Sequence, residues 1–283
     1  MPSVIIPAHN EEALIERVIE GVLADGIPDL ECVVVANACS DRTVDIARRY
    51  EPRIQVIDTP TPGKCNALNV GEKTLKTFPR VFLDGDIILE PGTLRTILAA
   101  SGPDRPLLSP MPRFNLEDAS LGIRLFYRAQ KFNAYFGNGS PNGSGTFVLS
   151  EEGRSRWDTF PEIIADDGFV QGHFRPEERS AVPTAYAVVG PPRDLSSMLR
   201  VRARVRRGWA QLREMHPELM KNHVAQGGSM IKQLLPRPWE WPSMLVYGYV
   251  RVGERLIARN QLRRNAGLEW GRDESARQSE TND

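Results

Sequence analysis

Val81-Phe82-Leu83-Asp84-Gly85-Asp86 is an apolar run that stops at two carboxylates flanking a glycine. Apolar side chains in such a run are typical of a buried strand, and the change to Asp-Gly-Asp predicts a turn directly after it. The glycine lets the backbone bend, so that one carboxylate can reach a hard cation while the other faces a second polar partner. A solvated Asp-Gly turn would give the same pattern. The stretch therefore predicts a strand end with a candidate cation site, and the rest of the chain must decide between the two interpretations.

The composition is that of an ordinary globular protein. The chain has 283 residues, 41% of them hydrophobic and 25% charged, which allows a sizeable core. Lys plus Arg and Asp plus Glu both number 36, so no net charge favours binding to nucleic acid. Cys32, Cys39 and Cys65 lack the spacing of a metal site or a disulfide framework. The sequence opens without a basic leader and contains no apolar run long enough to cross a bilayer, so we expect a cytoplasmic protein.

Short apolar strands alternate with amphipathic helices in the first third of the chain. The expected strands cover 4–7, 32–36, 54–57 and 81–83, and the expected helices cover 10–26, 41–50 and 64–76. Asn10 and Ser40 are the expected N-caps of the first two helices. This alternation predicts an α/β fold with a mainly parallel sheet and helices on both faces. In such sheets ligands bind beyond the carboxyl ends of the strands. That edge would hold the polar or turn-forming segments 7–12, 37–40, 63–64 and 84–86.

The alternation loosens after about residue 102. We expect a helix over 118–136, a Gly/Ser-rich loop over 137–145, a strand over 146–149 and an arginine-rich helix over 199–215. The Gly/Ser-rich loop could admit a sugar or be an ordinary surface loop. The predicted organisation is a catalytic domain over 1–195, a helical C-terminal extension packed on it over 196–268, and a polar tail without fixed structure over 269–283.

The ordered set of motifs resembles glycosyltransferase family 2, whose members have the GT-A fold, a Rossmann-like arrangement with a mixed, mainly parallel sheet. The matching blocks are Ser3-Val4-Ile5-Ile6-Pro7-Ala8-His9-Asn10-Glu11-Glu12, residues 37–41, Gly63-Lys64, Asp84-Gly85-Asp86 and Asp166-Asp167. The resemblance covers roughly residues 3–175, and the order of the blocks is far more specific than any one of them. It implies an inverting, hexosyl-type transferase that moves a sugar from a nucleotide-diphosphate sugar to an acceptor hydroxyl.

The resemblance places the donor at the first strand ends. The base of a UDP- or GDP-sugar would be held by Pro7, Ala8 and Glu11 or Glu12. Asn37 stands where the family usually has a carboxylate that contacts the base. Its amide can still donate and accept hydrogen bonds, but the choice of base stays open. Lys64 matches a basic residue near the donor nucleotide, or is an exposed lysine at the start of a helix.

Two pairs of acids would carry the chemistry that the resemblance implies. Asp84 and Gly85 would lie at the donor, and Asp86 together with Asp84 would bind Mg²⁺ or Mn²⁺, which offsets the charge of the departing diphosphate. Asp167 would be the general base that accepts the proton of the acceptor hydroxyl. Asp166 stands where the family usually has Glu, so its role is less defined. Both acids could instead form an acidic start of a helix.

Several alternatives stay open at this stage. His173, His216 and His223 are candidates for a further metal ligand. The apolar stretch 241–250, which continues through Arg251, Arg255 and Arg259 to make up the segment 241–259, could lie on the inner face of a membrane as a peripheral contact, or pack against the catalytic domain.

Two other functions compete with the transferase. A catalytically silent nucleotide-binding protein is kept open by Asn37 and Asp166, the departures from the family pattern. A sugar nucleotidyltransferase is disfavoured, because its first loop would be glycine-rich whereas this chain has Pro7-Ala8-His9-Asn10. The sequence leaves the sugar, the acceptor and the oligomeric state open.

Overall fold

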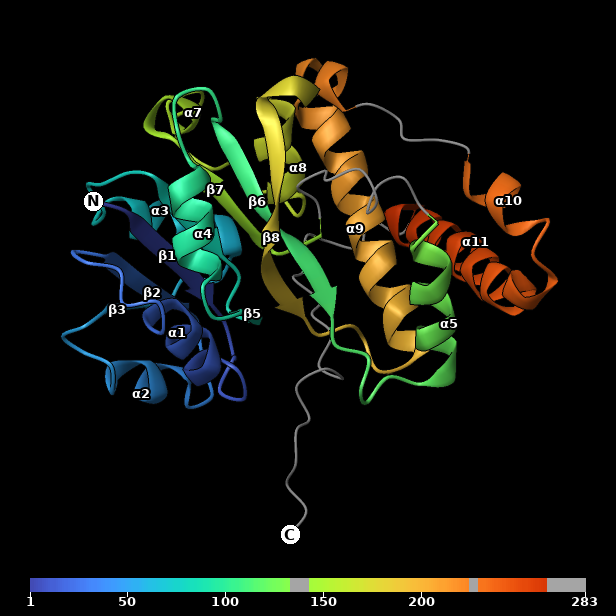
Figure 1. Cartoon of the computed structure of the whole chain (residues 1–283), viewed down its shortest axis with the longest axis horizontal. Helices are drawn as coiled ribbons and strands as arrows, with labels where there is room; N and C mark the ends of the chain where they lie inside the picture. The colour runs from blue at the N-terminus through green and yellow to red at the C-terminus, as the bar shows by residue number, and fades with distance from the viewer. Residues whose placement is uncertain (133–142, 224–228, 264–283) are drawn as a thin grey trace, which may run out of the picture. The chain divides into compact units, whose positions relative to one another are not determined.

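The computed structural model of the chain describes residues 1–132, 143–223 and 229–263 (Figure 1). The chain divides into two compact units that interleave along the sequence. The sheet unit comprises Met1–Arg113, Pro141–Glu162 and Phe174–Val189, and the helical unit comprises Phe114–Ser140, Ile163–His173 and Gly190–Asp283. The end of the helix expected over 118–136, most of the loop 137–145 and the tail 269–283 lie outside the described residues. The domain boundary expected near residue 195 stays a prediction.

The sheet unit is built on one eight-stranded sheet with the order β3-β2-β1-β4-β7-β6-β8-β5. Its parallel part contains β1 (Ser3–Ala8), β2 (Glu31–Asn37), β3 (Gln55–Thr59) and β4 (Arg80–Leu83). The remaining strands are β5 (Ile87–Leu89), β6 (Leu107–Phe114), β7 (Thr146–Leu149) and β8 (Arg179–Val189). Among them β7 pairs antiparallel with both β4 and β6, and β5 pairs antiparallel with β8. The sheet is thus mixed, and its parallel part holds the strand ends that the sequence places at the ligand edge.

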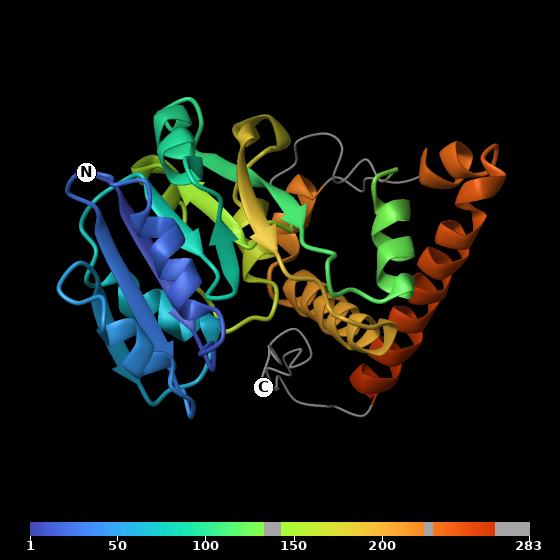
Figure 2. The same ribbon diagram turned by 60° about the horizontal axis from the view of Figure 1, so that its bottom comes forward.

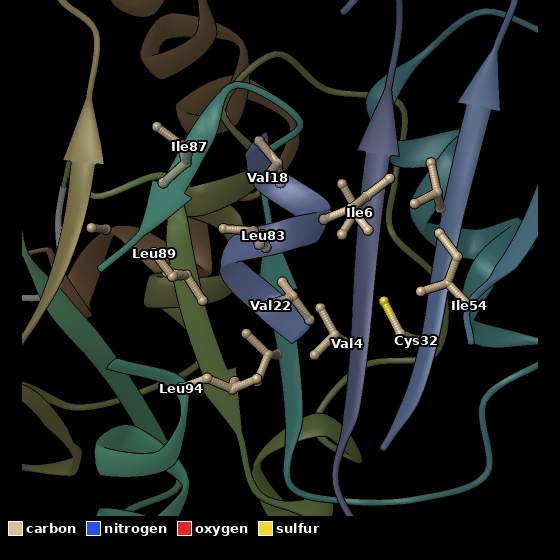
Figure 3. Packing of buried hydrophobic residues seen from close by; sticks show 14 of the residues in the cluster. Val4, Ile6, Val18, Val22, Cys32, Ile54, Leu83, Ile87, Leu89 and Leu94 are labelled. Atoms are coloured by element: carbon tan, nitrogen blue, oxygen red, sulfur yellow. The ribbon is translucent and has the colours of Figure 1, made fainter. Parts of the chain in front are cut away.

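Helices cover both faces of the parallel strands. The helices of this unit are α1 (Ile15–Leu23), α2 (Thr43–Arg48), α3 (Lys64–Glu72), α4 (Thr93–Ala100), α7 (Glu151–Arg154) and the 3-10 turn η1 (Pro176–Glu178). On one face Val4 and Ile6 of β1 pack with Val18 of α1 in a buried apolar cluster (Figure 3). On the other face α3 lies so close to the sheet that a Cβ at Gly71 would come within 2.9 Å of Val35. Each buried aliphatic side chain of this kind stabilises the fold by about 1.5–3 kcal/mol.

Two helices begin later than the sequence predicts. α1 starts at Ile15 rather than after Asn10, because Asn10 has φ 53° and the left-handed conformation cannot serve as an N-cap. The Asn10 side chain instead accepts a hydrogen bond from the Ser40 N–H at 2.8 Å. α2 starts at Thr43, so Ser40 is not its N-cap either. Both residues shape the loops that follow β1 and β2.

The helical unit contains α5 (Leu121–Gln130), α8 (Asp166–Gly172), α9 (Leu195–Met215), η2 (Pro217–Asn222), α10 (Ser229–Leu234), η3 (Pro238–Glu240) and α11 (Trp241–Arg263). Helices α5, α9 and α11 lie side by side (Figures 1 and 2). Phe126, Met198 and Val250 from these three helices form their shared core. Helix α9 begins four residues earlier than expected, because the Asp194 carboxylate caps it by accepting from the Ser197 N–H at 2.8 Å. Over the described residues, no helix combines the length and apolar character needed to cross a membrane.

Candidate functional site

The four segments expected at the ligand edge, 7–12, 37–40, 63–64 and 84–86, lie together in the sheet unit. With residues 41–43 added to the second segment, we call them the strand-end cluster. A chain of contacts joins them. His9 Nδ1 lies 2.6 Å from the Asn37 carbonyl oxygen, and the Gly63 N–H donates to Asn37 Oδ1 at 3.1 Å. Lys64 Nζ lies 2.7 Å from Asp84 Oδ1. The topology of a parallel sheet therefore brings together residues that are far apart in the sequence, as expected.

The turn after β4 is fixed by two close backbone approaches. A Cβ at Gly85 would come within 3.0 Å of the Pro7 carbonyl oxygen and 3.3 Å of Ala8 Cα, so the turn lies directly against the end of β1. The Asp84 N–H donates to the Gly145 carbonyl oxygen at 2.9 Å, and Gly145 adopts φ 59°, which favours glycine. Gly85 is buried, whereas Asp86 beside it is exposed. The turn thus presents a carboxylate to the surface next to the Lys64–Asp84 ion pair.

Asn37 is fully buried, and both ends of its amide contact the backbone. Its Nδ2 donates to the Ala8 carbonyl oxygen at 2.8 Å while its Oδ1 accepts from Gly63. The side chain thereby links the end of β1 to the start of α3. The expected contact between Asn37 and a nucleotide base stays a prediction, and the observed contacts give this residue a role in holding the loops.

The loop after β1 is joined to the loop after β2 through Asp41 and Thr43. The Thr43 hydroxyl accepts from the Glu11 N–H at 2.7 Å, and Asp41 Oδ2 accepts from the Glu12 N–H at 3.0 Å. Asp41 Oδ1 also accepts from the Thr43 N–H and hydroxyl. Burial raises the pKa of Asp41, but these hydrogen bonds outweigh it and hold the pKa below its ordinary value. This pair is absent from the residues expected at the site, although an Asp two residues before a Thr is typical of an Asx turn.

Glu11 and Glu12 differ in exposure. Glu11 is buried at the edge of the cluster, and Glu12 is exposed and forms an ion pair with Arg42 at 3.2 Å. Both belong to the same short turn before α1. The predicted donor residues Pro7, Ala8, Glu11, Glu12 and Lys64 all lie in the strand-end cluster.

Asp166 and Asp167 occupy the first turn of α8 in the helical unit, as the acidic-start interpretation expects. Asp166 is buried, and Asp167 is half-buried. Negative side chains in this position are favourable because the N-terminal end of a helix carries a partial positive charge. Of the two carboxylates, Asp167 is the more accessible to a substrate.

Helix α9 holds the segment that leads into α8. The Ile164 N–H donates to Gln211 Oε1 at 3.0 Å. A Cβ at Gly208 would come within 3.1 Å of the Ala165 nitrogen, and one at Gly168 would come within 3.0 Å of the Leu212 side chain. These close approaches fix the position of Asp166 and Asp167 relative to α9.

The three candidate histidines lie around α8 against aromatic rings. Phe169 contacts His173 and His216 with ring centroids 4.8 and 5.2 Å apart, and Trp209 contacts His223 with centroids 4.7 Å apart. In the part of the chain that the structure describes, no three His, Cys, Asp or Glu side chains are grouped closely enough to hold a metal ion. A histidine as a further metal ligand stays a prediction.

Comparison with known proteins identifies the family to which these segments belong. Residues 3–143 match the model of glycosyl transferase family 2. An uncharacterised glycosyltransferase, EpsJ of Bacillus subtilis (strain 168), is 34% identical over 87 residues, which cover 30% of this chain and 25% of EpsJ. The chain spans roughly a quarter or less of the length of the curated relatives that it matches.

Two solved structures share the fold. The mannosyltransferase PcManGT from Pyrobaculum calidifontis, in complex with GDP-Man and Mn²⁺, has a TM-score of 0.58 at 20% identity and covers 94% of this chain and 79% of its own. Glucosyl-3-phosphoglycerate synthase from Mycobacterium tuberculosis, in complex with Mn²⁺, UDP and glucosyl-3-phosphoglycerate, has a TM-score of 0.54 at 22% identity and covers 76% of this chain and 79% of its own. These likenesses confirm the expected α/β fold of the GT-A class. The chain therefore belongs to glycosyl transferase family 2 through its residues 3–143.

Proposed function

We propose that this protein is a metal-dependent, inverting glycosyltransferase that moves a hexosyl group from a nucleoside diphosphate sugar to an acceptor hydroxyl. The observation that carries the proposal is the strand-end cluster, in which Lys64 Nζ lies 2.7 Å from Asp84 Oδ1 beside the exposed Asp86. This cluster falls within the segment that matches the family. The similar structures that hold GDP-Man or UDP with Mn²⁺ support the class of donor.

The donor nucleotide would bind at the loops after β1 and β2. We assign its base to Pro7, Ala8 and the acids Glu11 and Glu12. Asn37 would support the donor site indirectly by holding its loops in place, because its amide is hydrogen-bonded to the Ala8 carbonyl and the Gly63 N–H. Lys64 supplies a positive charge beside the place where the diphosphate would lie. A cation there is favourable because diphosphate oxygens are anionic hydrogen-bond acceptors.

Asp84 and Asp86 fit a hard divalent cation. Both offer carboxylate oxygens, the ligand type that Mg²⁺ and Mn²⁺ prefer. Mg²⁺ is usually held by one or two carboxylates together with substrate phosphates rather than by a complete protein cage. A site of two carboxylates agrees with the absence of a three-ligand group from the described residues. When bound, the cation would offset the negative charge that the leaving diphosphate gains.

Asp167 would be the general base. It would accept the proton of the acceptor hydroxyl as that oxygen attacks the anomeric carbon from the side opposite the diphosphate. The bond between the anomeric carbon and the diphosphate oxygen breaks in the same step, so a single displacement inverts the configuration. A positioned base of this kind contributes about a hundred-fold to ten-thousand-fold in rate. Asp166, which is buried, would help to set the charge at the start of α8.

The test is the release of nucleoside diphosphate from UDP-glucose and GDP-mannose in the presence of Mn²⁺, since hydrolysis of the donor requires no knowledge of the acceptor. We expect Asp86→Asn and Asp167→Asn each to lower turnover about a hundred-fold or more. The control is Asp104→Asn, which changes an exposed carboxylate in the turn after α4. Circular dichroism would verify that all variants fold.

Two results would replace the proposal by its alternatives. Donor binding in calorimetry without turnover or metal dependence would indicate a silent nucleotide-binding protein. Synthesis of a sugar nucleotide from a sugar phosphate and a nucleoside triphosphate would indicate a nucleotidyltransferase. The match of residues 3–143 to the transferase family weighs against this second alternative.

A further inference from the structure

Helix α11 has an apolar outer face in addition to the face that packs in the core. The exposed fractions of the side chains on this outer stripe range from 47% to 70%, and its members are Trp241, Leu245, Tyr249, Val252 and Leu256. Their spacing of four, four, three and four residues places them on one side of the helix. The inner face uses other residues, among them Val250 and Ala258, which are buried. A surface helix normally has only one such apolar face, so the outer stripe requires an explanation.

Positive charge accompanies the outer stripe. Between residues 229 and 263 the basic residues are Lys232, Arg237, Arg251, Arg255, Arg259 and Arg263, and the acids are Glu240 and Glu254. Both acids are buried. The Glu240 carboxylate accepts a hydrogen bond from Arg128 of α5 at 2.7 Å, and the Glu254 carboxylate accepts one from Arg202 of α9 at 2.6 Å. The carboxylates of this segment are thus occupied inside the unit, whereas Arg255, Arg259 and Arg263 face the surface.

We propose that α11 is an interfacial helix that binds the surface of an anionic lipid bilayer through the outer stripe. The stripe extends over about 22 Å, at a rise of about 1.5 Å per residue from Trp241 to Leu256. Helices that lie in the plane of a membrane insert one apolar face between the headgroups and place basic side chains toward anionic lipid. Trp239 and Trp241, which are both exposed, supply the aromatic rings that favour the boundary between headgroups and acyl chains.

The charge pattern argues against a parallel pair of α11 helices from two copies of the chain as the occupant. Arg259 and Arg263 continue the stripe at intervals of three and four residues after Leu256. In a parallel pair of α11 helices, these arginines would lie directly opposite each other. Like charges in such positions destabilise the pairing. A bilayer with a negatively charged surface and an apolar layer beneath it complements both the apolar residues of the outer stripe and the arginines that continue it.

The test is flotation of the full chain with vesicles of phosphatidylcholine alone and of phosphatidylcholine mixed with phosphatidylglycerol. We expect binding to the mixed vesicles only, and weaker binding as salt concentration rises. Substitution of Leu245→Glu and Leu256→Glu together should abolish binding. The matched control is Leu121→Glu, which changes an equally exposed leucine on α5, where the side chain is 72% exposed.

Arginine variants test the charge separately from the apolar face. Arg255→Gln with Arg259→Gln should weaken binding about fivefold for each arginine. Arg17→Gln with Arg48→Gln, two exposed arginines of the sheet unit, should leave binding unchanged. Failure of the wild-type chain to float with anionic vesicles at low salt would overturn the proposal, as would folded leucine variants that bind normally. A dimer that dissociates in the leucine variants, without vesicle binding, would instead identify a second copy as the occupant.

Discussion

Asn37 illustrates how one buried amide can fix several loops at once. Its donor end contacts the Ala8 carbonyl oxygen and its acceptor end contacts the Gly63 N–H. We expect Asn37→Asp to destabilise the protein, although a carboxylate is what the family resemblance leads one to expect there. The substitution removes the donor and brings two oxygens together in a fully buried position, at a cost of about 1–3 kcal/mol. Urea unfolding measures the effect.

Asn69 provides the matched comparison, because its amide makes the same type of pair. It donates to the Phe160 carbonyl oxygen at 2.9 Å and accepts from the Phe160 N–H at 2.8 Å, but its side chain is only half-buried. Asn69→Asp should therefore lower the free energy of unfolding by less than Asn37→Asp does, since water can solvate the new carboxylate. Equal or higher stability in Asn37→Asp would show that the amide is not required in its observed role.

The hydrogen bonds to Asp41 predict a dependence of stability on pH. Its pKa is held below the ordinary value in the folded state. A carboxyl group with a lowered folded pKa stabilises the fold fully above the unfolded pKa, about 3.9, and loses that contribution as pH falls toward the folded pKa. The difference in unfolding free energy between wild type and Asp41→Asn should thus be constant near neutral pH and shrink below about pH 4. Urea titrations at several pH values check this, and a difference that grows with acid would contradict it.

Residue types predict which loops are polar, but not what each polar group contacts. Asn10 and Asn37 follow strands, and both amides could contact ligand, solvent or backbone. The choice depends on loops that arrive from elsewhere in the chain, namely the Ser40 N–H for Asn10 and the Gly63 N–H for Asn37. Such long-range partners leave no trace in the local pattern, so the sequence alone does not predict the contacts of these two amides.

At the scale of elements, close packing between α9 and the segment before α8 positions the proposed base. We expect Gly208→Ala to lower stability by about 1–3 kcal/mol, because the new methyl group would come within 2.9 Å of Ile164 Cγ2 and 3.1 Å of the Ala165 nitrogen. Displacement of Ala165 would move Asp166 and Asp167, so turnover of the donor should fall as well. Urea unfolding and the donor-hydrolysis assay measure the two effects.

Gly248 of α11 provides the control for this substitution. A Cβ there meets no atom of the structure within 4 Å. Gly248→Ala should stabilise the protein by about 0.5–1 kcal/mol, because alanine restricts the unfolded chain and favours the helix. If Gly208→Ala behaved like Gly248→Ala, the packing between α9 and α8 would have no bearing on the site.

The strands that the sequence predicts are those with continuous apolar runs. β1, β2 and β4 are buried on both faces, and the apolar run is their signature. β6 and β8 escape prediction because they contain prolines and polar residues, with the sequences LLSPMPRF and RSAVPTAYAVV. β5 has only three residues and is defined by its distant partner β8. The parallel half of the sheet and the apolar strand β7, expected over 146–149, were thus predictable, whereas β5, β6 and β8 depend on long-range pairing.

At the scale of the whole molecule, the topology of the parallel strands explains which segments form the strand-end cluster. The rule that ligands lie beyond the carboxyl ends of the strands selected four segments, and the structure joins them through Asn37, Gly63, Lys64 and Asp84. The interleaving of two compact units was not predictable, because segments 114–140 and 163–173 join the C-terminal helices only in three dimensions.

The small number of carboxylates in the proposed cation site leads to a prediction about the stability of the whole chain. The proposed cation site offers the two carboxylates of Asp84 and Asp86, and the described residues contain no group of three His, Cys, Asp or Glu side chains that could hold a metal ion. Mn²⁺ alone should therefore bind weakly and shift Tm little, whereas UDP or GDP together with Mn²⁺ should raise Tm by several degrees. A ligand at about one hundred times its Kd stabilises the folded state by about 2.7 kcal/mol.

Asp86→Asn should remove the cooperation between nucleotide and metal but leave the Tm of the free protein nearly unchanged, because Asp86 is exposed. Differential scanning fluorimetry with each component alone and with both measures this cooperation, and an equal shift with Mn²⁺ alone would mean that the protein completes the metal site without the diphosphate.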